Sequence, residues 1–226
     1  MAQIHQQSDF ELTYFNGRGL AETSRLIFAY AQIPYVDKRF PLDIIDFTKR
    51  QFQREEFDKA KADGELVLSL GKVPFLKTQG VTISQSKSIE RFLAKRFNCM
   101  GSTDLENALV DAFCEHLRDI KTDYQPYRKL EGEDKIRGLE KFFGDELPTK
   151  LKALEKTLSL NDDWLIGNFV SLADISLFSL MEFFDDKAKV VKTLQQSTPK
   201  LYASYYNLLN LPQIKEWVDN RPFTPF

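Results

Sequence analysis

The sequence predicts a mixed α/β N-terminal half followed by an all-helical C-terminal half. Two observations lead to this fold class. Up to residue 97, short stretches rich in β-branched and aromatic residues alternate with stretches of helical spacing, whereas beyond residue 103 the apolar residues follow helical spacing. This arrangement is typical of two packed domains. We place them at residues 1–97 and 103–226, on either side of the linker-like stretch FNCMGST.

The N-terminal elements follow the order β-α-β and then β-β-α. The turn residues Asn16-Gly17 and Gln79-Gly80 separate these elements. The charged segment 50–70 favours a solvated helix, and residues 41–71 as a whole carry weaker patterns. The predicted strands are Phe10–Phe15, Tyr35–Phe40, Val73–Lys77 and Val81–Ser84, and the predicted helices are Leu20–Gln32 and Ser86–Phe97.

The C-terminal helices are marked by capping residues and apolar stripes. Thr103 with Glu106, and Ser171 with Asp174, have capping-box spacing at the start of two helices. Pro148 interrupts a later stripe and predicts a kink or a split there. The stripes are Leu105, Leu109, Phe113, Leu117 and Ile120, then Phe142, Leu147, Leu151, Leu154 and Leu158, with further helices over Ile175–Phe184 and Pro212–Val218.

Composition excludes several classes of function. The net charge of −2, with acids and bases interspersed, gives no basic patch for a nucleic acid. No stretch approaches the roughly 20 apolar residues of a membrane helix, and the polar start MAQIHQQSDF does not resemble a signal peptide, so we expect a cytoplasmic protein without membrane insertion. Cys99 and Cys114 are expected to be buried thiols. His5 and His116 are too few and too scattered for zinc, and we predict no metal.

Tyr14 is the first candidate for chemistry, because it ends the first predicted strand just before Asn16-Gly17. A phenol is protonated at neutral pH and can donate a hydrogen bond to a thiolate. Such a bond lowers the pKa of a ligand thiol and so increases its nucleophilic fraction. The alternative is an amphipathic side chain that merely packs at a strand end.

Two further segments could bind an extended ligand. In Gly71-Lys72-Val73-Pro74, a cis proline would turn the Val73 backbone outward to pair with a peptide-like ligand, and Lys72 could meet a carboxylate. Gln85-Ser86 begins a predicted helix, whose exposed amides form a ready carboxylate site. The simpler alternatives are an edge-strand proline and an ordinary N-cap serine.

Together these features resemble the glutathione transferase family over nearly the whole chain, and most closely its sigma class. The resemblance is carried by five ordered stretches: LTYFNGRGLAE (Leu12–Glu22), GKVPFL (Gly71–Leu76), ISQSKSIERFLA (Ile83–Ala94), WLIGNFVSLADISL (Trp164–Leu177) and LPQIKEWVDNRP (Leu211–Pro222).

The resemblance implies a thioredoxin-like N-terminal domain, a helical C-terminal domain and glutathione as co-substrate. Tyr14 matches the family's catalytic tyrosine, and Ser171 with Asp174 matches its structural capping box. The remaining matches imply contacts with glutathione: Gly71, Lys72 and Val73 beside the cysteinyl backbone, with Pro74 as the cis proline; Gln85 and Ser86 at the γ-glutamyl end; and Asp119 reaching across a homodimer interface.

The chain departs from the family pattern at three places. Ile45 stands where sigma enzymes usually have a tryptophan at the glycine end of glutathione, and Lys49 matches a nearby glycine-carboxylate lysine. Leu20 replaces an arginine often found near the sulfur, while Arg18 is interpreted as a structural ion pair. The segment 50–70 is longer than usual and is interpreted as a helical insertion near the glutathione site.

The resemblance implies conjugation, in which the glutathione thiolate attacks a small hydrophobic electrophile. We expect the electrophile pocket between Phe15 and the helices around Ile120–Tyr127 and Leu209–Phe226. Two alternatives stay open. One is glutathione-dependent isomerisation of the prostaglandin D synthase kind. The other is a non-catalytic protein of the S-crystallin kind, which the altered positions Leu20 and Ile45 would favour.

Overall fold

The computed structural model describes residues 9–46, 49, 51–158 and 163–224. The polar N-terminal stretch used to argue against a signal peptide lies largely outside these residues, as do the last two residues of the chain. No helix within the described ranges is long and apolar enough to cross a membrane.

A four-stranded sheet organises the N-terminal half. Its strands are β1 (Phe10–Phe15), β2 (Val36–Phe40), β5 (Phe75–Thr78) and β6 (Val81–Ser84), in the spatial order β2-β1-β5-β6. Strand β1 runs parallel to β2 and antiparallel to β5. Leu12 of β1 lies opposite Leu76 of β5, and both side chains are completely buried. All four strands were predicted to within two residues, because their β-branched and aromatic residues fit a half-buried pleated surface.

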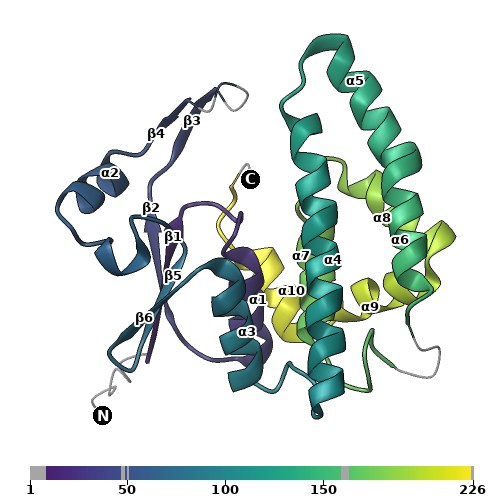
Figure 1. Ribbon diagram of the computed structural model, residues 1–226, viewed down its shortest axis with the longest axis horizontal. Coiled ribbons are helices and arrows are strands. Elements are labelled where there is room, and N and C mark those ends of the chain that lie inside the picture. The colour runs from purple at the N-terminus through teal and green to yellow at the C-terminus, as the bar shows by residue number, and fades with distance from the viewer. Residues whose placement is uncertain (1–8, 47–48, 50, 159–162, 225–226) are drawn as a thin grey trace.

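Helices α1 (Glu22–Ala31) and α3 (Ser86–Arg96) lie between this sheet and the helical half (Figure 1). The apolar segment Leu26–Phe28 of α1 is buried, as are Ile89 and Leu93 of α3. One hydrophobic cluster extends from β1 through these helices to the C-terminal helices. The two halves therefore share a continuous core, and this core fixes the position of the loops at their boundary.

The segment between β2 and β5 is only partly as predicted. Strands β3 (Asp43–Asp46) and β4 (Gln51–Gln53) form a separate antiparallel hairpin, followed by α2 (Glu55–Ala62) and the 3₁₀ turn η1 (Val67–Ser69). The helix expected within residues 50–70 is confirmed by α2, but the start of that segment is a strand. Cross-strand pairing of Ile44 with Phe52 accounts for the difference, because local spacing does not reveal such a pair.

All regular elements described in the C-terminal half are helices, which confirms the predicted fold class. Both capping boxes form as expected. The predicted interruption near Pro148 is a π-helical turn, η2 (Phe142–Glu146), consistent with the missing N–H of proline. The helices are α4 (Asp104–Arg128), α5 (Gly132–Lys141), α6 (Leu147–Glu155), α7 (Leu172–Met181), α8 (Lys187–Ser197), α9 (Pro199–Leu209) and α10 (Pro212–Asn220).

The two cysteines and the first apolar stripe of the C-terminal half were predicted to be buried. Cys99 and Cys114 are both free and buried, as expected, and burial raises the pKa of each thiol to about 12. The apolar stripe of α4 is buried from Phe113 onward, but Leu105 and Leu109 at its start are exposed. The first turns of α4 thus leave an apolar surface uncovered within one subunit.

Candidate functional site

The loop that follows β1 holds the Tyr14 hydroxyl. The backbone amide of Leu20 lies close enough to this hydroxyl to favour its ionised form. Gly19 has a φ of +40°, and a Cβ atom placed there would lie 2.6 Å from the Tyr14 Oη. A side chain at position 19 would therefore displace the phenol, so the glycine is needed both for its backbone conformation and for the close approach.

The electrostatic surroundings keep Tyr14 in its protonated form at neutral pH. Burial raises the pKa of its phenol, and this effect exceeds the opposing influence of the Leu20 amide and the Arg25 guanidinium. A protonated phenol has a proton that it can donate to an anion. Tyr14 is thus suited to stabilise a nearby anion.

Arg25 is a residue of this region that the sequence interpretation missed. Its side chain is completely buried, its Nη1 donates to the Gly17 carbonyl at 2.6 Å, and its Nε donates to Asp37 at 3.2 Å. It therefore ties the loop after β1 to strand β2. The sequence could have indicated this role, because Arg25 directly precedes the apolar run Leu26–Phe28 on a helix predicted to be buried. An unpaired charge at such a position would be costly, so a partner for Arg25 could have been expected.

The segment before β5 has the backbone features that the family resemblance implied. The Val73–Pro74 peptide bond is cis, and Gly71 has a φ of +68°, a conformation that favours glycine. Strand pairing begins only at Phe75, so Lys72 and Val73 lie just outside the ladder. Lys72 is exposed, and Val73 is partly exposed. This short segment is thus placed where a ligand backbone could extend the sheet.

The start of α3 differs from the simple N-cap alternative. Gln85, rather than Ser86, occupies the cap position, and no side chain caps the helix. Gln85 has a φ of +72°, which is unfavourable for a residue with a side chain. Strained backbone of this kind gathers at ligand sites. Ser86 is the first helical residue, and the amides of this turn have no side-chain acceptor at the cap.

A cavity of about 370 Å³ lies between the two halves of the molecule. Its walls include Gly19 and Leu20 after β1, Gln85 and Ser86 at the start of α3, and parts of α4 and α7. Of the three walls predicted for the electrophile pocket, only α4 lines this cavity. Phe15 instead packs beside Phe57 under α2, and α10 packs against α1 on another side of the molecule.

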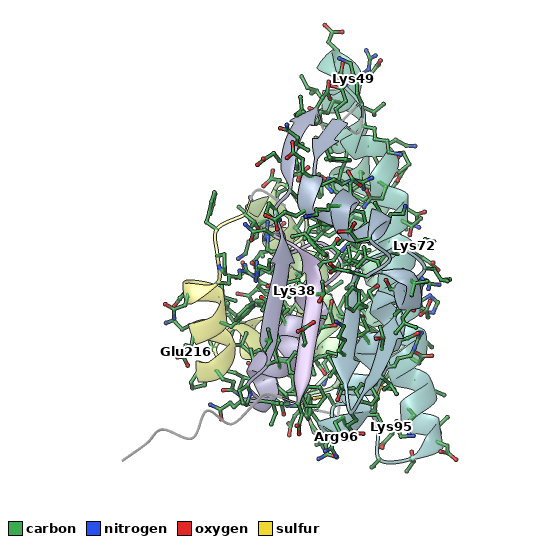
Figure 2. The ribbon with its side chains drawn as sticks, turned by 90° about the vertical axis from the view of Figure 1, so that its left-hand side faces the viewer. Lys38, Lys49, Lys72, Lys95, Arg96 and Glu216 are labelled. Carbon is green, nitrogen blue, oxygen red and sulfur yellow. The ribbon has the colours of Figure 1, made fainter. Side chains whose placement is uncertain are left out.

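Several predicted residues lie apart from this cavity. Lys49 is at the far end of the β3–β4 hairpin, well away from Lys72 (Figure 2), and its ammonium pairs with Asp46 at 3.1 Å. Ile45 is exposed on the same hairpin. Asp119 is exposed on α4 and does not line the cavity, whereas its neighbour Arg118 does.

Arg18 was expected to form an ion pair. Its guanidinium instead donates to the backbone carbonyl of Glu182 at 3.0 Å, so it joins the two halves without a carboxylate partner among the described residues. Arg18 thus has the structural role that was expected, but it fills this role through a backbone carbonyl instead of a carboxylate. The described residues also contain no cluster of three or more side chains suited to a metal ion.

Comparison with known proteins agrees with this geometry. Residues 119–221 match the model of the glutathione S-transferase C-terminal domain. The haematopoietic prostaglandin D synthase of Mus musculus is 30% identical over 96% of this chain and 98% of its own. The probable glutathione S-transferase 5 of Caenorhabditis elegans is 30% identical over 96% of this chain and 99% of its own. The solved structure of the Fasciola hepatica sigma-class enzyme is 26% identical, with a TM-score of 0.76, over 98% of this chain and 100% of its own.

The matches to the two relatives and to the solved structure extend over nearly the full length of both partners, and so they include the thioredoxin-like half as well as the helical one. The chain belongs to the glutathione S-transferase family. The family resemblance inferred from the five sequence stretches is therefore confirmed, together with the fold that it implied.

Proposed function

We propose that this protein conjugates glutathione to electrophiles, with Tyr14 donating a hydrogen bond to the glutathione thiolate. The observation that carries this proposal is the half-buried, protonated Tyr14 side chain, whose hydroxyl lies against Gly19, a residue that lines the cavity between the two halves. Stabilising the thiolate lowers the thiol pKa, and holding both reactants in one cavity supplies proximity. The reaction forms a carbon–sulfur bond and expels the leaving group of the electrophile.

The proposed glutathione site extends from Tyr14 in two directions. Toward the sheet, the Val73 backbone pairs with the cysteinyl part of the ligand, beside Gly71 and Lys72. Toward α3, Gln85 and the free amides at Ser86 hold the γ-glutamyl carboxylate. We leave Lys49 outside this set, because its ammonium pairs with Asp46 on the hairpin. With Ile45 also exposed there, we assign no hairpin residue to the glycine carboxylate.

The direct test is retention on glutathione-agarose followed by a conjugation assay with 1-chloro-2,4-dinitrobenzene. Retention with turnover is expected. Retention without turnover would instead favour a binding protein of the S-crystallin kind, and failure to bind glutathione would contradict the proposal. Isomerisation is a second candidate, favoured by the similarity to the mouse prostaglandin D synthase, and prostaglandin H₂ as substrate would reveal it.

Lys72→Ala is expected to raise the KM for glutathione about 5- to 20-fold while leaving kcat nearly unchanged. Lys72 lies three residues before β5, in the segment proposed to bind the peptide backbone of glutathione, so it would contact parts of the ligand that do not change during the reaction. Steady-state kinetics at varied glutathione measures both constants. A large fall in kcat at saturating glutathione would show that Lys72 acts on the chemical step.

We further propose a two-fold homodimer in which Asp119 reaches the γ-glutamyl ammonium in the partner subunit. The exposed apolar side chains Leu105 and Leu109 on α4, and Leu68 and Leu70 beside the proposed glutathione segment, support an interface with a second copy. The γ-glutamyl end carries an ammonium, for which Gln85 and Ser86 offer no negative charge. Asp119 would supply that charge.

Light scattering at micromolar concentration should give about twice the chain mass of 26.2 kDa. Asp119→Ala should weaken glutathione binding about 10-fold, as expected for the loss of one charge-assisted hydrogen bond, without changing that mass. Asp134→Ala, another exposed acid, is the matched control. A monomer with full activity would contradict the cross-subunit role.

We also propose a cytoplasmic location, which the free thiols Cys99 and Cys114 support.

A further inference from the structure

Lys121 brings a positive charge to the cavity between the two halves. It comes from α4 and lies on the wall formed with Gly19 and Leu20. Its Nζ atom is 3.4 Å from the Gly19 carbonyl oxygen and 4.0 Å from the centre of the Phe183 ring. The carbonyl contact is long, and the aromatic face offers only a partial negative charge. Neither contact neutralises the ammonium.

The carboxylates around Lys121 are committed elsewhere. Glu90, which lines the same cavity, already binds the Lys87 ammonium at 2.7 Å. The remaining cation on the cavity wall, Arg118, pairs with Glu115. Within the part of the chain that the structure describes, no carboxylate lies within ion-pair distance of Lys121. A partly buried cation without a counterion is costly, and an anionic ligand would remove that cost.

The position of Lys121 relative to Tyr14 indicates which of the two substrates would bring an anionic group to Lys121. Gly19 contacts both residues, since its carbonyl faces the Lys121 ammonium and its Cα side faces the Tyr14 hydroxyl. A group bound at Lys121 would therefore lie near the sulfur held by Tyr14. The γ-glutamyl carboxylate of glutathione has its own place at the uncapped start of α3. The electrophile is then the ligand that reaches Lys121.

We propose that Lys121 determines substrate specificity by binding a carboxylate on the electrophile, so that this enzyme prefers acidic electrophiles to neutral ones of the same shape. This inference rests on the conjugating function proposed above and names the substrate class of that site. Thr122 and Gln125 on α4, and Ser179 on α7, line the same cavity and provide uncharged hydrogen-bonding groups for the rest of such a molecule.

The charge on Lys121 also predicts how this preference depends on pH. Burial, with smaller contributions from the nearby cations Lys87, Arg128 and Arg18 and against the opposing effect of Glu90, lowers the pKa of Lys121 to about 8. The ammonium is present below this pKa and is lost above it. The preference for an acidic electrophile should therefore be largest near pH 6.5 and should fade by about pH 9.

The test compares 4-chloro-3-nitrobenzoate with 4-chloro-3-nitrobenzamide as electrophiles. In each case the glutathione thiolate attacks the carbon that bears chlorine, the carbon–sulfur bond forms, and chloride leaves with the bonding electrons. The ratio of kcat/KM for the acid to that for the amide is measured in the parent, in Lys121→Met and in Lys121→Arg. Lys95→Met, which changes an exposed lysine on α3 (Figure 2), is the matched control.

Lys121→Met should lower the acid-to-amide ratio about 10-fold or more, the effect of losing one charge-assisted hydrogen bond. Lys121→Arg should retain most of the ratio, and Lys95→Met should leave it unchanged. Parallel losses for acid and amide would overturn the proposal, because Lys121 would then act on the sulfur or on the fold. A rise confined to the KM for glutathione would overturn it as well, because Lys121 would then bind the peptide.

A binding measurement separates failure of this inference from failure of the proposed function. Calorimetry compares S-(4-carboxybenzyl)glutathione with S-(4-carbamoylbenzyl)glutathione, which require no turnover. Tighter binding of the acid by the parent, lost in Lys121→Met, supports the inference. Equal affinity for both conjugates overturns the inference and leaves the glutathione site intact, whereas no binding of either conjugate overturns both.

Discussion

Replacing Tyr14 with phenylalanine is expected to lower kcat/KM for conjugation about 10- to 100-fold at neutral pH, with the fold unchanged. The substitution removes one hydroxyl and almost no volume. The variant loses the hydrogen bond from the hydroxyl to the thiolate. A hydrogen bond to a charged group has a net contribution of about 1.5–3 kcal/mol. The rate should recover at high pH, where glutathione ionises without assistance, so the kinetic pKa should move upward toward that of a free thiol.

The measurement is a pH–rate profile for the parent and the variant, with circular dichroism to confirm the fold. Tyr30→Phe is the matched control, because Tyr30 is also partly exposed but lies on α1, where its phenol is near Cys99 and Asp174 instead of Gly19. It should leave the profile unchanged. If the profile of the Tyr14 variant overlays that of the parent, Tyr14 does not stabilise the thiolate.

Asp174→Ala should lower the free energy of unfolding by about 3–5 kcal/mol. The side chain is completely buried at the start of α7. Its two oxygens accept hydrogen bonds from the Ser171 amide and hydroxyl, the Leu165 amide and the Ser204 hydroxyl. Alanine would leave these donors without an acceptor inside the core.

The second capping box provides the comparison. Glu106 caps α4 together with Thr103 in the same local geometry, but its contacts are exposed to solvent. Glu106→Ala should therefore cost only about 1 kcal/mol, because water replaces the lost acceptor. Urea unfolding of both variants measures the difference. Equal losses would show that capping, rather than burial of the network, gives Asp174 its importance.

Local sequence patterns were sufficient for most of the secondary structure. Strands β1 and β6 begin and end where the spacing predicted, and both capping boxes are present. These features depend on residues close together in the chain. The cis Val73–Pro74 bond, in contrast, was expected only from the family resemblance. The β3–β4 hairpin was missed, because it depends on the pairing of Ile44 with Phe52 across eight positions of sequence that carry no strand pattern.

The residues of the candidate site likewise fall into those that a local motif indicates and those that only long-range packing brings together. The sequence by itself determined the family, because the five stretches that carry the resemblance are short motifs. The glutathione-binding segments at Tyr14, Gly71–Val73 and Gln85-Ser86 stay predictions that the resemblance implies. Only the tertiary structure decided which distant side chains join them. It places Lys121 from α4 against Gly19, buries Arg25 beneath the same loop, and leaves Lys49 on a distant hairpin. Such contacts arise from the packing of one half against the other, which no local spacing records.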